Sequence, residues 1–132
     1  MRLFDTSFLV DVVRGRERAR TVLDQIDAHG ERPATTEVNA YEILYGAYPG
    51  GQLDAKRFAA MQKVLSRFDV LPLDRAGAIQ AAEISARLVA QGRPIGALDI
   101  LVAGIALASG YTTIVTRDVD FRRIRELRVE TY

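Results

Sequence analysis

The chain has 132 residues, of which 48% are hydrophobic and 27% are charged, so we expect one globular domain over residues 1–132 and not a disordered segment. Its formal net charge is +1, and the absence of cysteine excludes disulfides, thiolate metal sites and thiol nucleophiles. Residues 97–108 are nearly apolar but are too few to span a bilayer, and no signal peptide precedes the first apolar run. We therefore expect a cytoplasmic protein with no membrane segment.

The chain opens with a short apolar run, residues 1–4, that predicts a buried strand ending directly before Asp5. A helix is expected over residues 8–13, with Thr6 or Ser7 as its cap. In open α/β sheets ligands bind at the carboxyl ends of the strands, so Asp5 is a candidate functional group. The alternative is that Asp5 only caps the helix that follows it.

The next part of the chain predicts a helix over residues 17–28, a short strand over residues 32–35 and a helix over residues 37–48 capped by Thr36. Glu42 lies inside this last helix, beside or within its apolar stripe. A carboxylate in that position either faces a site or, as most helical glutamates do, faces solvent.

Three tyrosines, Tyr41, Tyr45 and Tyr48, recur at helical spacing in the same segment as Glu42. The pattern fits core packing as well as a surface that receives another chain. Because three buried hydroxyls would all need hydrogen-bond partners, we predict that part of this stripe borders a groove for a partner helix or strand.

In the second half, we expect helices over residues 53–68, 75–91 and 97–108 and a strand over residues 69–73. The helix over residues 97–108 is apolar on every face except at Asp99, which predicts a buried helix. A carboxylate in such a place needs a compensating partner, either a metal ion or an arginine.

A β-branched strand is expected over residues 112–116, and a last short strand over residues 129–131. Two acids, Asp118 and Asp120, follow the first of these strands in the way that Asp5 follows the opening one. Alternating strands and helices predict an α/β fold with a mostly parallel five-stranded sheet flanked by helices on both faces, so that Asp5 and Asp118 share one edge.

If Glu42 and Asp99 also reach that edge, four carboxylates meet without a lysine, histidine or cysteine between them. Such a group needs protons or a cation, and all-oxygen ligation favours Mg²⁺ or Mn²⁺ over Zn²⁺. These ions activate water and neutralise a phosphodiester during displacement. If Asp120 joins the pocket too, the remaining surface carries 18 basic against 12 acidic residues, and 16 of the basic residues are arginine, which favours contact with phosphate.

The chain resembles the PIN-domain ribonucleases over essentially its whole length, and within them the VapC-type toxins of bacterial toxin–antitoxin pairs. The resemblance rests on four segments in this order and spacing: Phe4-Asp5-Thr6-Ser7, Tyr41-Glu42-Ile43-Leu44-Tyr45-Gly46, Ile95-Gly96-Ala97-Leu98-Asp99-Ile100 and Val115-Thr116-Arg117-Asp118-Val119-Asp120-Phe121.

This resemblance implies Asp5 and Asp99 as ligands of Mg²⁺ or Mn²⁺ and Glu42 as an acid that binds the metal or orients its water. It implies a fourth acid as well, for which we prefer Asp118 to Asp120 because Asp118 is nearer the end of the strand. Thr6 and Thr116 would support the pocket by hydrogen bonds.

The same resemblance implies hydrolysis of an RNA phosphodiester to a 5′-phosphate and a 3′-hydroxyl. It also implies a homodimer and a small cognate antitoxin that inserts a peptide into the site.

Two other functions compete with this one. A phosphatase of the haloacid-dehalogenase kind also carries an aspartate after its first strand, but it needs a second acid where Ser7 stands and a late lysine, and no lysine follows Lys63. A binding module that has kept the fold and lost activity is the other alternative, and the presence of all four acids argues against it.

Overall fold

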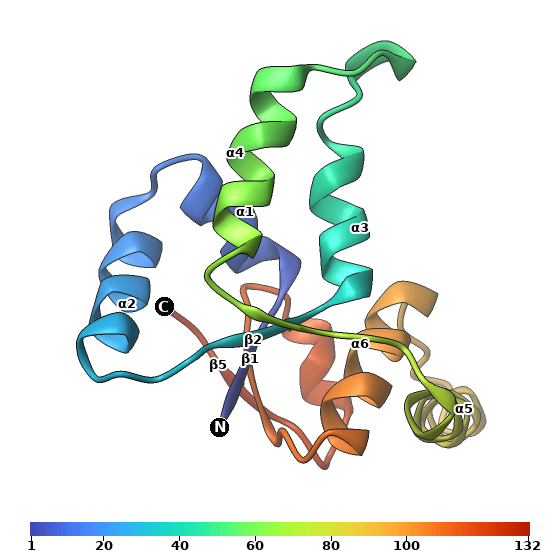
Figure 1. Ribbon diagram of the computed structural model, residues 1–132. Helices are drawn as coiled ribbons and strands as arrows, with labels where there is room; N and C mark the ends of the chain where they lie inside the picture. Colours follow the sequence, from blue (N-terminus) through green and yellow to red (C-terminus); the bar gives the residue numbers. More distant parts are fainter.

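The computed structural model describes residues 1–132 and consists of five strands, six α-helices and two short 3₁₀ helices (Figure 1). No helix has the length and apolar character needed to cross a membrane. The elements in chain order are β1 (Arg2–Phe4), α1 (Thr6–Val13), α2 (Glu17–Ala28), β2 (Ala34–Thr36), α3 (Glu37–Tyr45), η1 (Pro49–Gly51), α4 (Ala55–Leu65), β3 (Asp69–Leu71), α5 (Arg75–Ala90), α6 (Ala97–Ala108), β4 (Thr113–Val115), η2 (Val119–Arg123) and β5 (Arg128–Glu130).

The five strands form one sheet in the order β3-β2-β1-β4-β5, and every pair is parallel. The chain moves outward from β1 through β2 to β3 and then returns to the other side of β1 with β4, so the strand order reverses between β1 and β4. Phe4 pairs with Val115 across this junction. The residues after these two strands therefore emerge side by side at the point where parallel α/β sheets bind ligands.

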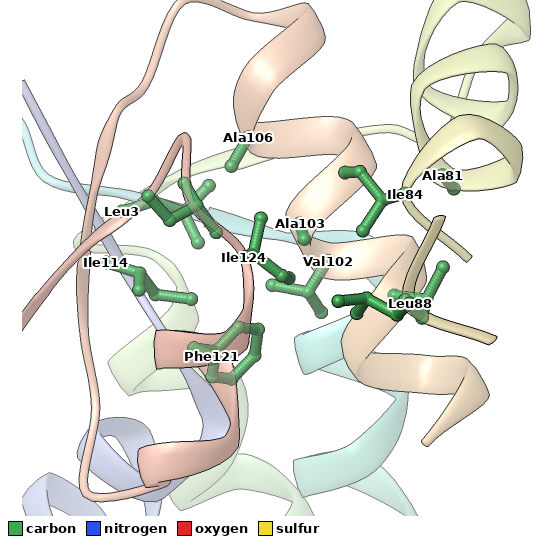
Figure 2. Close-up of a cluster of buried hydrophobic side chains, with 12 residues drawn as sticks. Leu3, Ala81, Ile84, Leu88, Val102, Ala103, Ala106, Ile114, Phe121 and Ile124 are labelled. Atoms are coloured by element: carbon green, nitrogen blue, oxygen red, sulfur yellow. The ribbon is translucent and has the colours of Figure 1, made fainter. Parts of the chain in front are cut away.

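Two hydrophobic clusters cover the two faces of the sheet. Leu3 of β1 and Ile114 of β4 contribute to the cluster under α5 and α6, which Figure 2 shows in close-up. Their neighbours Phe4 and Val115 contribute to the cluster under α1 to α4. Successive strand residues point to opposite faces, so the short apolar runs of the sequence fill both cores. The predicted α/β fold, with a five-stranded sheet and helices on both faces, is confirmed, and the sheet is wholly parallel.

Several local predictions need correction. α3 ends at Tyr45 instead of Tyr48, because the chain turns at Gly46 and enters the 3₁₀ helix that begins at Pro49. α1 begins at Thr6, so neither Thr6 nor Ser7 is its cap. Thr36 does cap α3, and its hydroxyl accepts a hydrogen bond from the backbone N–H of Asn39. Four of the strands are also shorter than predicted, β5 has the predicted length but begins one residue earlier, and η2 was not expected.

Candidate active site

Asp5 follows β1 directly, and only 4% of its surface is exposed. It occupies the N-cap position of α1, but its carboxylate makes no capping hydrogen bond. The carboxylate instead accepts a 2.9 Å bond from the Asn39 amide on Oδ1 and a 2.8 Å bond from the Thr116 hydroxyl on Oδ2. Burial raises the pKa of Asp5, and these hydrogen bonds offset part of that rise. The interpretation of Asp5 as a helix cap alone is therefore wrong.

Asn39 is a residue of the site that the sequence analysis missed. It is fully buried in the first turn of α3, and its amide nitrogen donates to Asp5 and, at 2.9 Å, to the hydroxyl of Thr6. Its carbonyl oxygen accepts from the hydroxyl of Thr36 at 2.7 Å. The one sequence signal is its position three residues after the capping Thr36, where a side chain reaches back to the helix start.

Glu42 lies one turn further along α3 and is partly buried. Its Oε1 accepts a 2.7 Å hydrogen bond from the hydroxyl of Thr6, which in turn accepts from Asn39. This chain of bonds ties Glu42 to the group that holds Asp5. The alternative of a fully solvated surface glutamate is therefore wrong.

Thr116 follows β4 and links three parts of the site. Its hydroxyl donates to Asp5 and accepts a 2.9 Å hydrogen bond from the backbone N–H of Asp118. The carboxylate of Asp118 accepts from the backbone N–H of Asp120 at 2.9 Å and so caps η2. Asp120 itself forms an ion pair with Arg123 at 3.5 Å. Of the two candidates for the fourth acid, only Asp118 is left without a cationic partner.

Asp99 enters the site from the first turn of α6 and is partly exposed. Burial raises its pKa to about 7, and the charges of Asp5, Asp118 and Glu42 add to the rise. The charges of the other three acids therefore act on Asp99, and the four predicted carboxylates lie close enough to repel one another. None of them forms an ion pair with a lysine, arginine or histidine. The alternative of an arginine partner for Asp99 is thus wrong.

The chemistry of this group fits a hard divalent cation. All the donors are oxygens, a positive charge would relieve the repulsion that Asp99 experiences, and no side chain supplies that charge. No group of three or more acidic, histidine or cysteine side chains converges as a cage for an ion. The carboxylates of Asp5 and Glu42 are instead held by the hydroxyl and amide donors of Thr6, Asn39 and Thr116.

A cavity of about 360 Å³ lies beside Glu42, between α1, α3 and α4. Its wall is partly apolar, with Val10, Val13, Ile43 and Met61, and it also contains Arg14 and Arg57. None of the three tyrosines lines it. Tyr41, Tyr45 and Tyr48 are 57%, 71% and 42% exposed, so the alternative of a tyrosine core is wrong. The rings of Tyr41 and Tyr45 lie 6.3 Å apart on an open surface of α3.

A second feature that the sequence did not reveal is the buried carboxylate of Asp11. It pairs with the guanidinium of Arg117 at 2.9 Å and accepts a 2.5 Å hydrogen bond from the hydroxyl of Tyr132. Burial and the bond to Asp11 raise the pKa of Tyr132 to about 12, so this hydroxyl stays protonated. The network fixes Arg117, which lies between Thr116 and Asp118, to α1 and to the end of the chain.

Known proteins resemble this chain over nearly its whole length. The sequence model of the PIN domain matches residues 2–127. A protein of Shigella flexneri described as the tRNA(fMet)-specific endonuclease VapC is 28% identical over 130 residues, which cover 98% of this chain and 96% of that protein. A protein of Salmonella typhimurium with the same description is 24% identical over the same shares of both chains.

Solved structures show the same fold. The DNA-bound VapBC complex of Salmonella typhimurium contains a chain that superposes with a TM-score of 0.86 at 26% identity, covering 98% of this chain and 96% of that one. A chain of the VapBC2 complex of Rickettsia felis, bound to a DNA fragment of its promoter, gives a TM-score of 0.88 at 22% identity and covers 99% of this chain and 98% of that one.

Proposed function

The chain belongs to the PIN domain family, and we propose that it is the endoribonuclease toxin of a toxin–antitoxin pair. The single observation that carries this proposal is the group of four carboxylates without a cationic partner at the junction of β1 and β4. The alignment with relatives described as VapC endonucleases extends over nearly the whole chain and supports the same function. Because the chain belongs to this family, the alternative of a haloacid-dehalogenase phosphatase is wrong.

We propose that Asp5 and Asp99 hold Mg²⁺ or Mn²⁺, with Asn39 and Thr116 orienting the Asp5 carboxylate. The cation would neutralise the phosphodiester and lower the pKa of water. Glu42, fixed by Thr6, then orients the attacking water, and Asp118 completes the acidic group. Attack on phosphorus leaves a 5′-phosphate and a 3′-hydroxyl without a covalent enzyme intermediate. Cleavage of cellular RNA would place this activity in the cytoplasm.

Because the relatives from Shigella flexneri and Salmonella typhimurium are described as tRNA(fMet)-specific, initiator tRNA is the first substrate to test. With Mn²⁺ the protein should cleave it, and chelation should stop the reaction.

Asp5→Asn should lower the rate of RNA cleavage by at least about 100-fold, since it removes a ligand charge at the reacting centre. Asp118→Ala should cost more activity than the matched variant Asp120→Ala. Absence of RNA cleavage with either ion would support a binding module that has lost activity.

We further propose that the exposed tyrosines Tyr41, Tyr45 and Tyr48 contact the cognate antitoxin. Exposed aromatic rings supply apolar area to an interface, while their hydroxyls stay compatible with water. Tyr45→Ala should weaken the complex by about tenfold and leave the thermal stability of the free protein unchanged. Equal loss of stability and of partner affinity would contradict this role.

A further inference from the structure

A second cavity, of about 410 Å³, lies next to the cavity beside Glu42 and shares Arg14 with it. Its lining comes from the end of α1, the turn into α2, Arg117 and the end of the chain. The residues that matter here are Asp11, Arg14, Arg16, Arg18, Arg117 and Tyr132. We call this cavity the arginine pocket.

The lining of the arginine pocket has a net positive charge, with four arginines against two acids. Asp11 is neutralised by its ion pair with Arg117, which leaves Glu17 as the one other acid of the lining. Arg14, Arg16 and Arg18 form no ion pair and no side-chain hydrogen bond, so three guanidinium groups remain available. The pocket also contains the first turn of α2, whose N-cap residue Arg16 supplies no capping side chain. Free N–H groups and the helix dipole favour an anion at such a turn.

The arginine pocket is joined to the acidic group in two ways. The backbone N–H of Arg117 donates to the hydroxyl of Ser7 at 3.0 Å, and that hydroxyl lies 3.2 Å from the hydroxyl of Thr116, the donor to Asp5. In addition, Arg14 lines both this pocket and the cavity that contains Glu42. Because Arg14 borders both cavities, a polymer with regularly spaced negative charges can extend from the cavity beside Glu42 to the arginines.

We propose that the arginine pocket binds a backbone phosphate of the RNA strand, away from the bond that is cut, and so holds the substrate across the acidic group. This inference rests on the proposed function, because it assigns a place to that substrate. Guanidinium groups match phosphate oxygens in a bidentate manner, which suits three unpaired arginines in one concavity. The Asp11–Arg117–Tyr132 network serves as the fixed wall of the pocket.

The test is a binding titration with a fluorescein-labelled single-stranded RNA of 12 nucleotides, in the Asp5→Asn background so that the strand is not cut. The pocket variant is Arg16→Gln with Arg18→Gln. The matched control is Arg125→Gln with Arg128→Gln, which removes the same charge before and at the start of β5, at the end of that strand away from Tyr132. Affinity is measured at several salt concentrations, and steady-state cleavage is measured with Asp5 intact.

The pocket variant should bind about tenfold more weakly. Its slope of log affinity against log salt should be shallower by about 0.7 for each phosphate that the arginines no longer neutralise. Its KM should rise by a similar factor while kcat stays within about twofold, and the control should keep the slope and KM of the parent. If the parent cleaves RNA and the pocket variant behaves like the control, the pocket assignment is wrong while the nuclease function stands.

If the Asp5→Asn background binds RNA with a salt slope that the pocket variant lowers, yet the protein with Asp5 intact cuts no RNA with Mn²⁺, the nuclease function fails and the pocket assignment stands. Absence of RNA binding by the parent overturns both.

Discussion

The buried carboxylate of Asp5 forms no ion pair, so its orientation depends on two neutral hydrogen-bond donors. Asn39 and Thr116 each donate one hydrogen bond to a different oxygen of its carboxylate. These bonds favour the ionised form, while burial and the charge of Glu42 oppose it. The orientation of the most buried acid therefore depends on the residue that the sequence analysis missed.

Asn39→Ala should destabilise the protein by about 2–3 kcal/mol, since it leaves buried groups of Asp5 and Thr36 without partners. Urea unfolding measures this loss, and RNA cleavage should fall at the same time. Gln62→Ala, which removes an amide from an exposed helical position, is the control and should change stability by less than about 0.5 kcal/mol. A stable and fully active Asn39→Ala variant would show that Asp5 needs no such support.

The raised pKa of Asp99 predicts how stability depends on pH. An unfolded aspartate ionises near 3.8, whereas Asp99 in the folded protein ionises near 7. Between these values the folded state holds a proton that the unfolded state has lost, so the metal-free protein should lose stability as pH rises from about 4 to 7. Asp99→Asn removes this penalty and should be more stable than the parent at pH 8, by about 1–2 kcal/mol after allowance for solvent screening.

The measurement is urea unfolding in chelator at pH 5 and pH 8. The difference between Asp99→Asn and the parent should be larger at pH 8. An equal difference at both values would contradict the raised pKa.

The proximity of three of the four acids could be predicted from the sequence because each stands at a recognisable place. Asp5 and Asp118 follow apolar strands, and Asp99 is the one charge in an apolar helix. Asn39 carries no such mark, since its partner Asp5 lies 34 residues earlier and an asparagine inside a helix has many ordinary uses. Asp11 was missed for the same reason, because Arg117 and Tyr132 reach it from the far end of the chain.

Among the elements, α5 and α6 pack more closely than any sequence pattern indicated. Gly104 of α6 faces α5, and a methyl group added there would lie 2.5 Å from the carbonyl oxygen of Gly77 and 2.7 Å from Cβ of Ala81. This approach brings Val102 and Ala103 into the core next to Ile84 and Leu88 (Figure 2). α6 carries Asp99, so the depth of this helix also sets where that acid lies.

Gly104→Ala should destabilise the protein by about 1–2 kcal/mol, because the clash with the backbone of α5 outweighs a gain of about 1 kcal/mol in helix propensity. Gly96→Ala is the matched control at the start of the same helix, where the nearest atom lies at an ordinary 3.9 Å. Thermal unfolding of both variants measures the difference. Equal stability of the two variants would contradict close packing of the two helices.

Helix boundaries were predicted less well than helix identity. The tyrosine pattern continues to Tyr48, yet α3 ends at Tyr45 because Gly46 and Pro49 favour a turn. The 3₁₀ helix after β4 arises from the capping carboxylate of Asp118, a local hydrogen bond that hydrophobic periodicity does not reveal.

At the scale of the whole molecule, the strand order converts separate sequence signals into one site. Only a reversal between β1 and β4 places Asp5 beside Thr116 and Asp118. α3 then contributes Glu42 from its middle turn, and α6 contributes Asp99 from its first turn. Alternation of strands and helices predicts a parallel sheet, but the order of the strands depends on long-range packing that the sequence pattern leaves open.

The claim that these acids form a metal centre is tested most directly by calorimetric titration of Mn²⁺ into the metal-free protein. The parent should bind the ion, and Asp5→Asn and Asp99→Asn should each weaken binding by at least about tenfold, since each removes a ligand charge. Asp120→Asn should bind as the parent does, because Asp120 is paired with Arg123. Unchanged affinity in Asp5→Asn and Asp99→Asn, or no binding by the parent, would contradict the account.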